Sequence, residues 1–306
     1  MKVLITGGAG YIGTELAAIL NENPSISEIV IYDNLMRGNY NLFIGQTKQK
    51  GDKLRFVKGE LLDTRKLKEE LEGIDIVYHL AAKVTTPFAD QNPHEFEQVN
   101  HWGTAELIYA VEESNVKQFI YLSSTSVYGA SKNSLNIDSE LNPKTFYGIS
   151  KMRGEDHVKR LINSSVKTYI LRCGNVYGYS KSMRFDSVIN KFMFEANFNK
   201  QIRIYGNGNQ NRSFIHIDRM KLALTNIIQS GLKSGIYNLT ESTFSINEII
   251  DVIKDIYPEM EMLFVNQNMK LRELIIEFDT RLSGLANFQK NALKEDLTEF
   301  KTRFTF

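Results

Sequence analysis

The chain has 306 residues, of which 42% are hydrophobic and 24% charged, and its formal net charge is +1. This balanced charge argues against nucleic acid or a membrane surface as partner, and no apolar run approaches the ~20 residues that span a bilayer. Cys173 is the only cysteine and the five histidines are scattered, so we expect no disulfide and no metal site. The first predicted strand begins at Lys2, which leaves no room for a signal peptide and favours a cytoplasmic location.

The N-terminal residues combine a buried strand with a glycine-rich turn. Residues 2–6 form an apolar run typical of a buried strand, and Gly7, Gly10 and Gly13 follow before a predicted helix over 14–21. Glycines at this spacing allow a tight turn, close approach of the backbone to a phosphate, and close packing of helix on strand. The free N–H groups at the start of the helix would then face a pyrophosphate.

An acidic residue completes the dinucleotide pattern. A second predicted strand over 29–32 ends in Asp33, which could accept hydrogen bonds from the adenosine ribose hydroxyls and repel a 2′-phosphate. The pattern therefore predicts a dinucleotide site that favours NAD over NADP. Arg37, four residues later, keeps NADP as an alternative, and a glycine turn in another α/β protein is the structural alternative.

The alternation of strand and helix continues along the chain. It predicts a parallel, doubly wound α/β sheet with right-handed crossovers. His79 falls inside one strand and is interpreted as a packed residue rather than a catalyst. The predicted strands cover 54–59, 75–82 and 117–122, and the predicted helices cover 64–72 and 93–114.

Tyr147 and Lys151 stand four residues apart in a segment that reads as a helix, so both side chains share one face. An ammonium near a phenol favours the phenolate and lowers a pKa that is ordinarily about 10. The strand over 117–122 delivers Ser123 and Ser124 to the carboxyl edge of the sheet, where a hydroxyl can share the proton. The spacing alone could be a chance pairing on a helix. With a bound nicotinamide to accept the hydride, these side chains would together oxidise a secondary alcohol.

Several motifs in this order resemble one family. The chain is similar over nearly its whole length to the extended short-chain dehydrogenases/reductases of the NAD-dependent epimerase/dehydratase family. The motifs are Thr6-Gly-Gly-Ala-Gly-Tyr-Ile-Gly13, Asp33-Asn34-Leu35, His79-Leu-Ala-Ala82, Asn100-x-x-Gly-Thr104, Ser123-Ser-Thr-Ser-Val-Tyr-Gly129 and Tyr147-x-x-x-Lys151.

The resemblance implies a Rossmann-type fold with bound NAD and assigns roles to the motif residues. Tyr147 would be the catalytic acid/base, Ser124 the catalytic hydroxyl, and Lys151 would bind the nicotinamide ribose and lower the tyrosine pKa. The residues implied to hold the cofactor are Gly7, Gly10, Tyr11, Ile12, Gly13, Asp33, Asn34, Glu60, Leu61, Leu80, Ala81, Ala82, Lys83, Asn100, Ser123, Tyr147 and Lys151.

The later motifs imply a nucleoside-diphosphate sugar as substrate. The stretch 206–218 closely matches the family's Gly-x-Gly-x-Gln-x-Arg-x-Phe-x-His-x-x-Asp pattern, with Asp218 one position nearer to His216. In this pattern Arg212 would grip the diphosphate with its planar fork. Tyr179 stands where a proline is usual, and the following segment resembles a Met-Arg-Phe-Asp…Asn variant; Arg184 there could equally be an exposed residue at the start of a surface helix. The implied substrate residues are Ser124, Thr125, Asn175, Arg184, Asn190, Arg212 and Arg272.

The residues after Ser124 narrow the range of reactions that the chain is expected to catalyse. The sugar 4,6-dehydratases of this family carry an Asp-Glu pair where this chain has Thr125-Ser126, and hydroxyls cannot replace that pair in eliminating water. We therefore expect a nucleotide-sugar 4-epimerase. A 4-dehydrogenase or 4-ketoreductase is the main alternative, and a 4,6-dehydratase or a catalytically silent NAD-binding protein is less favoured.

The domain organisation follows from the same patterns. Residues 1–173 and about 204–239 are expected to form the NAD-binding domain, and about 174–203 with 240–306 a smaller α/β substrate lobe. Residues 235–239 read as a late strand and 245–256 as an amphipathic helix capped by Ser245. By resemblance, the helices near 94–114 and 147–163 would form a homodimer.

Overall fold

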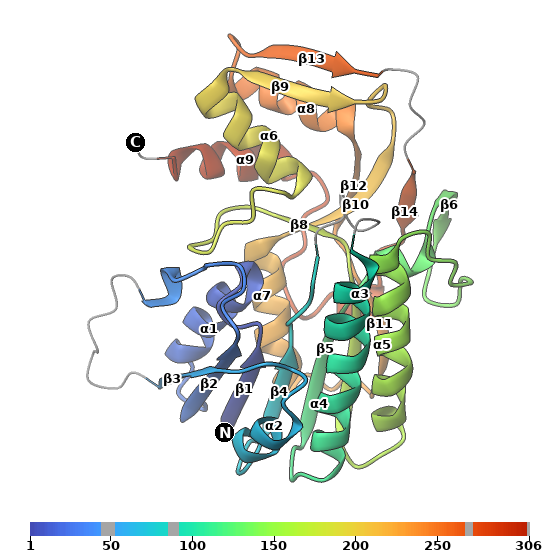
Figure 1. The fold of residues 1–306 in the computed structure, drawn as a ribbon. Coiled ribbons are helices and arrows are strands. Elements are labelled where there is room, and N and C mark those ends of the chain that lie inside the picture. The colour runs from blue at the N-terminus through green and yellow to red at the C-terminus, as the bar shows by residue number, and fades with distance from the viewer. Residues whose placement is uncertain (44–52, 85–91, 267–271, 305–306) are drawn as a thin grey trace.

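The large domain is built on one parallel sheet. The computed structural model describes residues 1–43, 53–84, 92–266 and 272–304. Within them seven parallel strands form a sheet in the order β11-β7-β5-β4-β1-β2-β3 (Figure 1), which confirms the predicted Rossmann-type α/β fold. The strands are β1 (Lys2–Thr6), β2 (Glu28–Asp33), β3 (Leu54–Lys58), β4 (Ile76–His79), β5 (Gln118–Ser124), β7 (Lys167–Cys173) and β11 (Gly235–Leu239).

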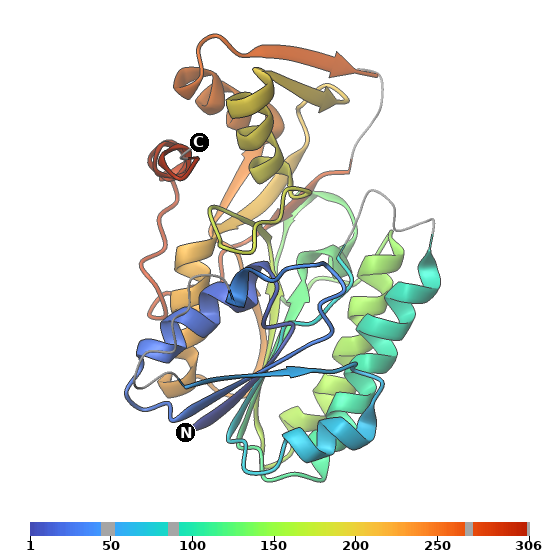
Figure 2. The same ribbon diagram turned by 60° about the vertical axis from the view of Figure 1, so that its left-hand side comes forward.

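Helices cover both faces of this sheet, as Figures 1 and 2 show. α1 and α7 pack together on one face over a core that includes Leu16 and Leu224. α2, α4 and α5 cover the other face over a core that includes Leu107 and Val158. No helix of the described chain is long and apolar enough to cross a membrane. The helices of this domain are α1 (Tyr11–Glu22), α2 (Thr64–Glu70), α3 (Pro93–Phe96), α4 (Gly103–Glu112), α5 (Phe146–Ile162) and α7 (Ile217–Asn226).

The long helix expected over 93–114 is interrupted. A π-helical turn, Glu97–Trp102, separates α3 from α4. It contains Asn100, which is fully buried and whose side chain binds both the backbone N–H and the C=O of Lys83. Such turns are single-turn distortions that occur often at functional sites. Here the turn fixes the segment that follows β4 against the helix layer.

A smaller lobe sits beyond the carboxyl ends of the large sheet (Figure 1). One of its sheets runs β12-β10-β14-β6 with β8 beside β10, and the other pairs β9 with β13. Residues 201–216 thus belong to these small sheets, and the chain returns to the large sheet only at α7 and β11. The elements are β6 (Ser131–Leu135), β8 (Asn175–Tyr177), β9 (Gln201–Tyr205), β10 (Asn211–His216), β12 (Ser242–Ser245), β13 (Glu261–Val265), β14 (Leu274–Ile276), α6 (Val188–Phe194), α8 (Ile246–Ile256) and α9 (Leu293–Thr302).

α8 shows how local sequence sets an element of this lobe. Ser245 caps the helix by accepting a hydrogen bond from the Glu248 N–H, and the Glu248 carboxylate accepts one from the Ser245 N–H in return. The predicted helix and its Ser245 cap are confirmed, and Glu248 completes a capping box that was not predicted. Ile249 and Ile253 point into the core of the lobe, so the apolar face of α8 holds α6 and α9 together.

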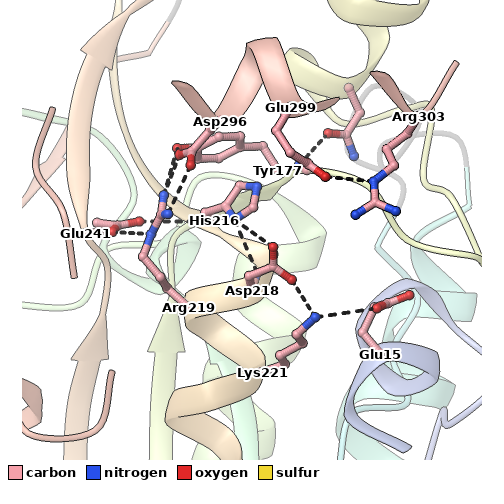
Figure 3. Close-up of polar contacts among 12 residues, drawn as sticks. Glu15, Tyr177, His216, Asp218, Arg219, Lys221, Glu241, Asp296, Glu299 and Arg303 are labelled. Atoms are coloured by element: carbon pink, nitrogen blue, oxygen red, sulfur yellow. Dashed lines mark hydrogen bonds and ion pairs between the residues drawn. The ribbon is translucent and has the colours of Figure 1, made fainter. Parts of the chain in front are cut away.

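Charged side chains join the two parts of the molecule, as Figure 3 shows. Arg219 on α7 pairs with Glu241, which lies between β11 and β12, and makes a two-point contact with Asp296 on α9. The Tyr177 hydroxyl donates to the same Asp296 carboxylate at 2.6 Å. We call Arg219, Glu241 and Asp296 the Arg219 clamp, because it fastens the C-terminal helix to the large domain.

Candidate active site

The glycine-rich turn lies where β1 ends and leaves no room for side chains. Gly7 has a φ of +71°, and a Cβ there would lie 2.6 Å from the Ala81 backbone. A Cβ on Gly13 would lie 2.5 Å from the Gly7 carbonyl oxygen. The turn therefore brings bare backbone and the start of α1 to the carboxyl edge of the sheet. This cradle fits the pyrophosphate of a dinucleotide.

Asp33 at the end of β2 lies beside this turn. Its carboxylate accepts hydrogen bonds from the backbone N–H groups of Ala9 at 3.0 Å and Leu35 at 2.8 Å. Burial raises the pKa of Asp33, and these two hydrogen bonds partly oppose that rise. Next to it, the Asn34 amide donates to Glu60 at 3.0 Å, so β2 and β3 present polar groups together. Arg37 reaches instead toward Asp186, at 3.4 Å.

Replacing Asp33 by serine is expected to weaken NAD binding roughly 10- to 100-fold. A hydrogen bond to a charged group contributes about 1.5–3 kcal/mol, and the variant also loses the charge that repels a 2′-phosphate. Fluorescence titration with NADH and NADPH measures both affinities, and the NAD preference should fall. An Asp63→Asn control removes a carboxylate that caps α2 away from the turn. Unchanged NADH and NADPH affinities in the Asp33 variant would contradict the assignment.

Several other predicted cofactor residues serve the fold through their side chains. The Tyr11 hydroxyl donates to the Gly178 carbonyl at 2.7 Å, and the Asn100 amide is committed to Lys83 and Ser150. The Ser123 hydroxyl donates to Glu155 at 2.6 Å. Any contact of Tyr11 or Asn100 with a cofactor would thus pass mainly through backbone atoms or through the segments they hold. The cofactor role of the whole predicted set, including Gly10, Ile12, Leu61, Leu80 and Ala82, stays a prediction.

The predicted catalytic hydroxyls meet at the end of β5. Ser124 ends the strand and Tyr147 lies in the first turn of α5, where the Thr145 side chain caps the helix by accepting from the Gly148 N–H. Ser124 and Tyr147 lie near enough to each other for the Ser124 side chain to affect the pKa of Tyr147. Burial raises the pKa of Tyr147, whereas the Ser124 side chain and the charge of Arg184 lower it in part. A lowering by Lys151, expected from the resemblance, stays a prediction.

Lys151 lies one turn further along α5 and is 2% exposed. Its ammonium nitrogen sits 4.2 Å from the centre of the Tyr121 ring. Burial lowers the pKa of Lys151 to about 7, and the charge of Glu155 opposes this fall. A lysine in this position changes its charge near neutral pH, so a small change in its surroundings alters how much of it is protonated.

Replacing Lys151 by methionine is expected to stabilise the NAD-free protein at pH 7 by about 2 kcal/mol. With a folded-state pKa near 7 against 10.5 unfolded, the unfolded chain binds more protons between these values, so burial of the lysine costs stability that is regained as the pH rises to about 10.5. Loss of the ammonium–ring contact offsets part of the gain. Urea unfolding at pH 7 and pH 10 should show the advantage of the variant shrinking with pH; a constant difference would contradict the assignment.

Two predicted substrate residues lie in the segment after β8. The Arg184 guanidinium donates to Asp186 at 2.9 Å and to the Val84 carbonyl at 2.9 Å, and its charge acts on both Tyr11 and Tyr147. Asn190 is fully buried, accepting from the Gly178 N–H and donating to the Arg184 carbonyl. The charge of Arg184 therefore acts on the tyrosine that is predicted to be catalytic, and Asn190 holds the segment that carries Arg184.

Arg212 and Arg272, both predicted to bind the substrate, come together in the smaller lobe. Arg212 opens β10 and Arg272 precedes β14, and burial and the charge of Arg272 both lower the pKa of Arg212. No carboxylate of the described residues pairs with either guanidinium. Asn175 lies on the neighbouring strand β8 and donates to the Ser213 carbonyl at 3.1 Å. Two close cations without a counter-ion form a natural site for an anion.

The sequence reasoning missed a buried ion pair beneath the site. Glu155 and Arg172 form a two-point contact, with side chains 0% and 3% exposed. Two signals could have found it: Glu155 follows Tyr147 and Lys151 at four-residue spacing on one helix face, and Arg172 interrupts an apolar strand. Thr125, assigned to the substrate, is buried at the start of a short 3₁₀ turn after Ser124.

Comparison with known proteins decides the family. A family model described as "NAD dependent epimerase/dehydratase family" matches residues 3–240, well over half of the chain. The chain belongs to this family. The resemblance inferred from the motifs is confirmed, and the protein is an enzyme that depends on NAD.

Relatives within the epimerase/dehydratase family carry two kinds of chemistry. A Methanocaldococcus jannaschii protein named as a candidate UDP-glucose 4-epimerase is 30% identical over 82% of this chain and 81% of its own. Human dTDP-D-glucose 4,6-dehydratase is 32% identical over 85% and 76%. Among solved structures, the UDP-N-acetylglucosamine 4-epimerase of Methanobrevibacter ruminantium is 25% identical with a TM-score of 0.87, covering 99% and 97%. The UDP-glucuronic acid 4-epimerase of Bacillus cereus shares the fold at 24% identity, TM-score 0.87, over 99% and 98%.

Proposed function

We propose that this protein is a nucleotide-sugar 4-epimerase. The observation that carries the proposal is that Ser124 at the end of β5 and Tyr147 in the first turn of α5 lie next to each other, with Thr125 and Ser126 rather than carboxylates after Ser124. This set can move one proton at one sugar hydroxyl, but it lacks the second acid/base pair that elimination of water requires. The solved relatives that bind UDP sugars together with NAD support the same reading.

The residues of this chain would divide the work between proton transfer and binding. Ser124 would orient the sugar 4-hydroxyl, and Tyr147 would take its proton to leave a 4-keto sugar and then return the proton to the product. Bound NAD supplies the oxidising and reducing equivalents for the same carbon. The guanidinium groups of Arg212 and Arg272 would hold the diphosphate while the keto sugar turns its other face toward the site. No external redox partner is then needed.

A 4-dehydrogenase or 4-ketoreductase is the second candidate, because the same groups without the return step give net oxidation or reduction. The segment from Tyr179 to Asn190 departs from the usual family pattern, and this is the reason for retaining the second candidate. The Ser180 hydroxyl of this segment donates to the Tyr11 carbonyl at 2.9 Å, next to the glycine-rich turn, and the charge of Arg184 acts on Tyr147. A change there would alter how the keto sugar is held between the two half-reactions.

Turnover of a panel of nucleotide sugars tests the proposal. The purified protein would first be scanned near 340 nm for bound reduced cofactor and then incubated with UDP- and dTDP-linked hexoses, uronic acids and N-acetylhexosamines. An epimerase gives sugar inverted at C4 with no net NADH. Accumulating NADH and ketone would instead identify a dehydrogenase, and tight NAD binding with no turnover of any sugar would identify a silent binding protein.

We also propose that two copies associate through α4 and α5, which run side by side at the edge of the molecule (Figure 1). Trp102 and Tyr109 are 54% and 39% exposed on this helix layer, which is unusual for large aromatic side chains and typical of an interface. Light scattering of the purified protein, compared with a Trp102→Glu variant, tests the dimer. The cytoplasmic location expected from the sequence stays a prediction.

A further inference from the structure

A fully buried carboxylate lies one helical turn beyond Lys151. Glu155 is 0% exposed and follows Lys151 by four residues on α5, so both side chains point to the same side of the helix. The carboxylate accepts from Arg172 at 3.0 and 2.8 Å and from the Ser123 hydroxyl at 2.6 Å. Hydrogen bonds from two strands thus hold its position.

The other titratable groups around Lys151 carry no negative charge at neutral pH. Burial raises the pKa of Tyr121 on β5 well above its ordinary value and that of Cys173 on β7 to about 12. Burial also raises the pKa of Tyr147 on α5 itself. His79 on β4 is neutral, since burial holds its pKa well below the ordinary value, and its ring nitrogens bond to threonine hydroxyls.

Two arginines in this region carry a positive charge, and each is paired with a carboxylate. Arg172 on β7 is paired with Glu155 and also donates to the Tyr128 hydroxyl at 2.9 Å. Arg184 is paired with Asp186 and acts on Tyr147. Among the described residues whose charge acts on Lys151, Glu155 is therefore the one that favours its ammonium form.

We propose that Glu155 is a positioning residue that keeps Lys151 charged beside Tyr147 by holding a fixed carboxylate one helical turn away. Arg172 and Ser123 fix this carboxylate, and Ser123 is joined through the strand end to Ser124. The Glu155–Arg172 pair thus links Lys151 to the end of β5, where Ser124 lies. The inference rests on the proposed function only in that it takes Lys151 to act as a cation in catalysis.

The titration of Lys151 tests this directly. Full-length protein saturated with NAD would be labelled with ¹³C at the lysine ε-carbons, and the Lys151 signal would be identified by its loss in Lys151→Met. In Glu155→Gln, which keeps hydrogen-bonding groups but removes the charge, we expect the Lys151 midpoint to fall by roughly one pH unit, a tenfold loss of proton affinity. The matched Asp156→Asn control removes an exposed carboxylate from the same helix and should leave the midpoint unchanged.

A second variant covers the case in which Glu155→Gln fails to fold because Arg172 is left buried and unpaired. The double variant Glu155→Gln/Arg172→Met leaves no unpaired charge. Because it also removes the Arg172 cation, which disfavours a second cation nearby, the Lys151 midpoint should fall by less than in Glu155→Gln. An unchanged Lys151 midpoint in either folded variant would overturn the proposal, even if activity were lost. Because the titration needs no sugar, it decides about Glu155 whether or not the protein proves to be an epimerase.

Discussion

Replacing Tyr147 by phenylalanine is expected to lower kcat by about 10²- to 10⁴-fold while leaving NAD affinity almost unchanged. The substitution removes only the hydroxyl that lies near Ser124, and a positioned acid/base group contributes a factor of this size. The ring would keep its edge contact with Phe96 at 6.4 Å between centroids, so the fold of α5 should survive. Steady-state kinetics on the sugar identified in the panel, with NADH titration alongside, measures both quantities.

The matched control is Tyr205→Phe, which removes a hydroxyl from a half-exposed tyrosine on β9 in the smaller lobe. It should retain the turnover of the unchanged protein. Retained turnover in the Tyr147 variant would remove this residue from the proton-transfer step. Loss of NAD binding together with turnover would show that the tyrosine holds the cofactor or the fold rather than the proton.

Replacing Arg219 by methionine is expected to lower the free energy of unfolding by about 3–5 kcal/mol. Arg219 is 11% exposed and pairs with Glu241 and Asp296, which are 1% and 10% exposed. Removing one partner of a buried ion pair leaves uncompensated charges in the interior, and this accounts for the size of the effect. Urea unfolding without NAD, followed by circular dichroism, gives the free energy.

Arg303→Met is the matched control for the Arg219 clamp. Arg303 pairs with Glu299 on the last helix, as Figure 3 shows, but both side chains are about half exposed. Exposed pairs of this kind contribute at most about 1 kcal/mol because water screens the charges. Equal losses in the two variants would mean that the clamp contributes no more than a surface pair. A larger loss for Arg219 would show that α9 is fastened to the large domain through buried charge.

The predictable part of the site consists of residues whose role follows from their neighbours in the chain. The glycine turn at 7–13, Asp33 at a strand end and the pair Tyr147 and Lys151 are patterns of local spacing, and the structure places them at the carboxyl edge of one sheet. The helix capped by Ser245 is predictable for the same reason. Parallel strands bring their carboxyl ends together, so the order of elements was enough to predict which residues share that edge.

The remainder depends on contacts between distant segments. Glu155 and Arg172 meet only because α5 packs over β7, and Arg219, Glu241 and Asp296 come from three separate elements. Residues from about 204 onward were expected to belong to the NAD-binding domain, but β9 pairs with β13 and β10 with β12 and β14. The choice of partner for a strand depends on tertiary contacts, and the polar residues of a short strand do not reveal it.

Local pattern by itself determined the α/β fold, the dependence on NAD and the identity of the expected proton-transfer group, because each needs only a few residues at fixed spacing. The tertiary structure alone decided the electrostatic environment of Lys151, which lies one helical turn from that group. Burial against Tyr121 brings the pKa of Lys151 to about 7, and a carboxylate four residues away opposes that fall. Burial and electrostatic fields arise from the packing of many segments, and the linear sequence records the participants without their separations.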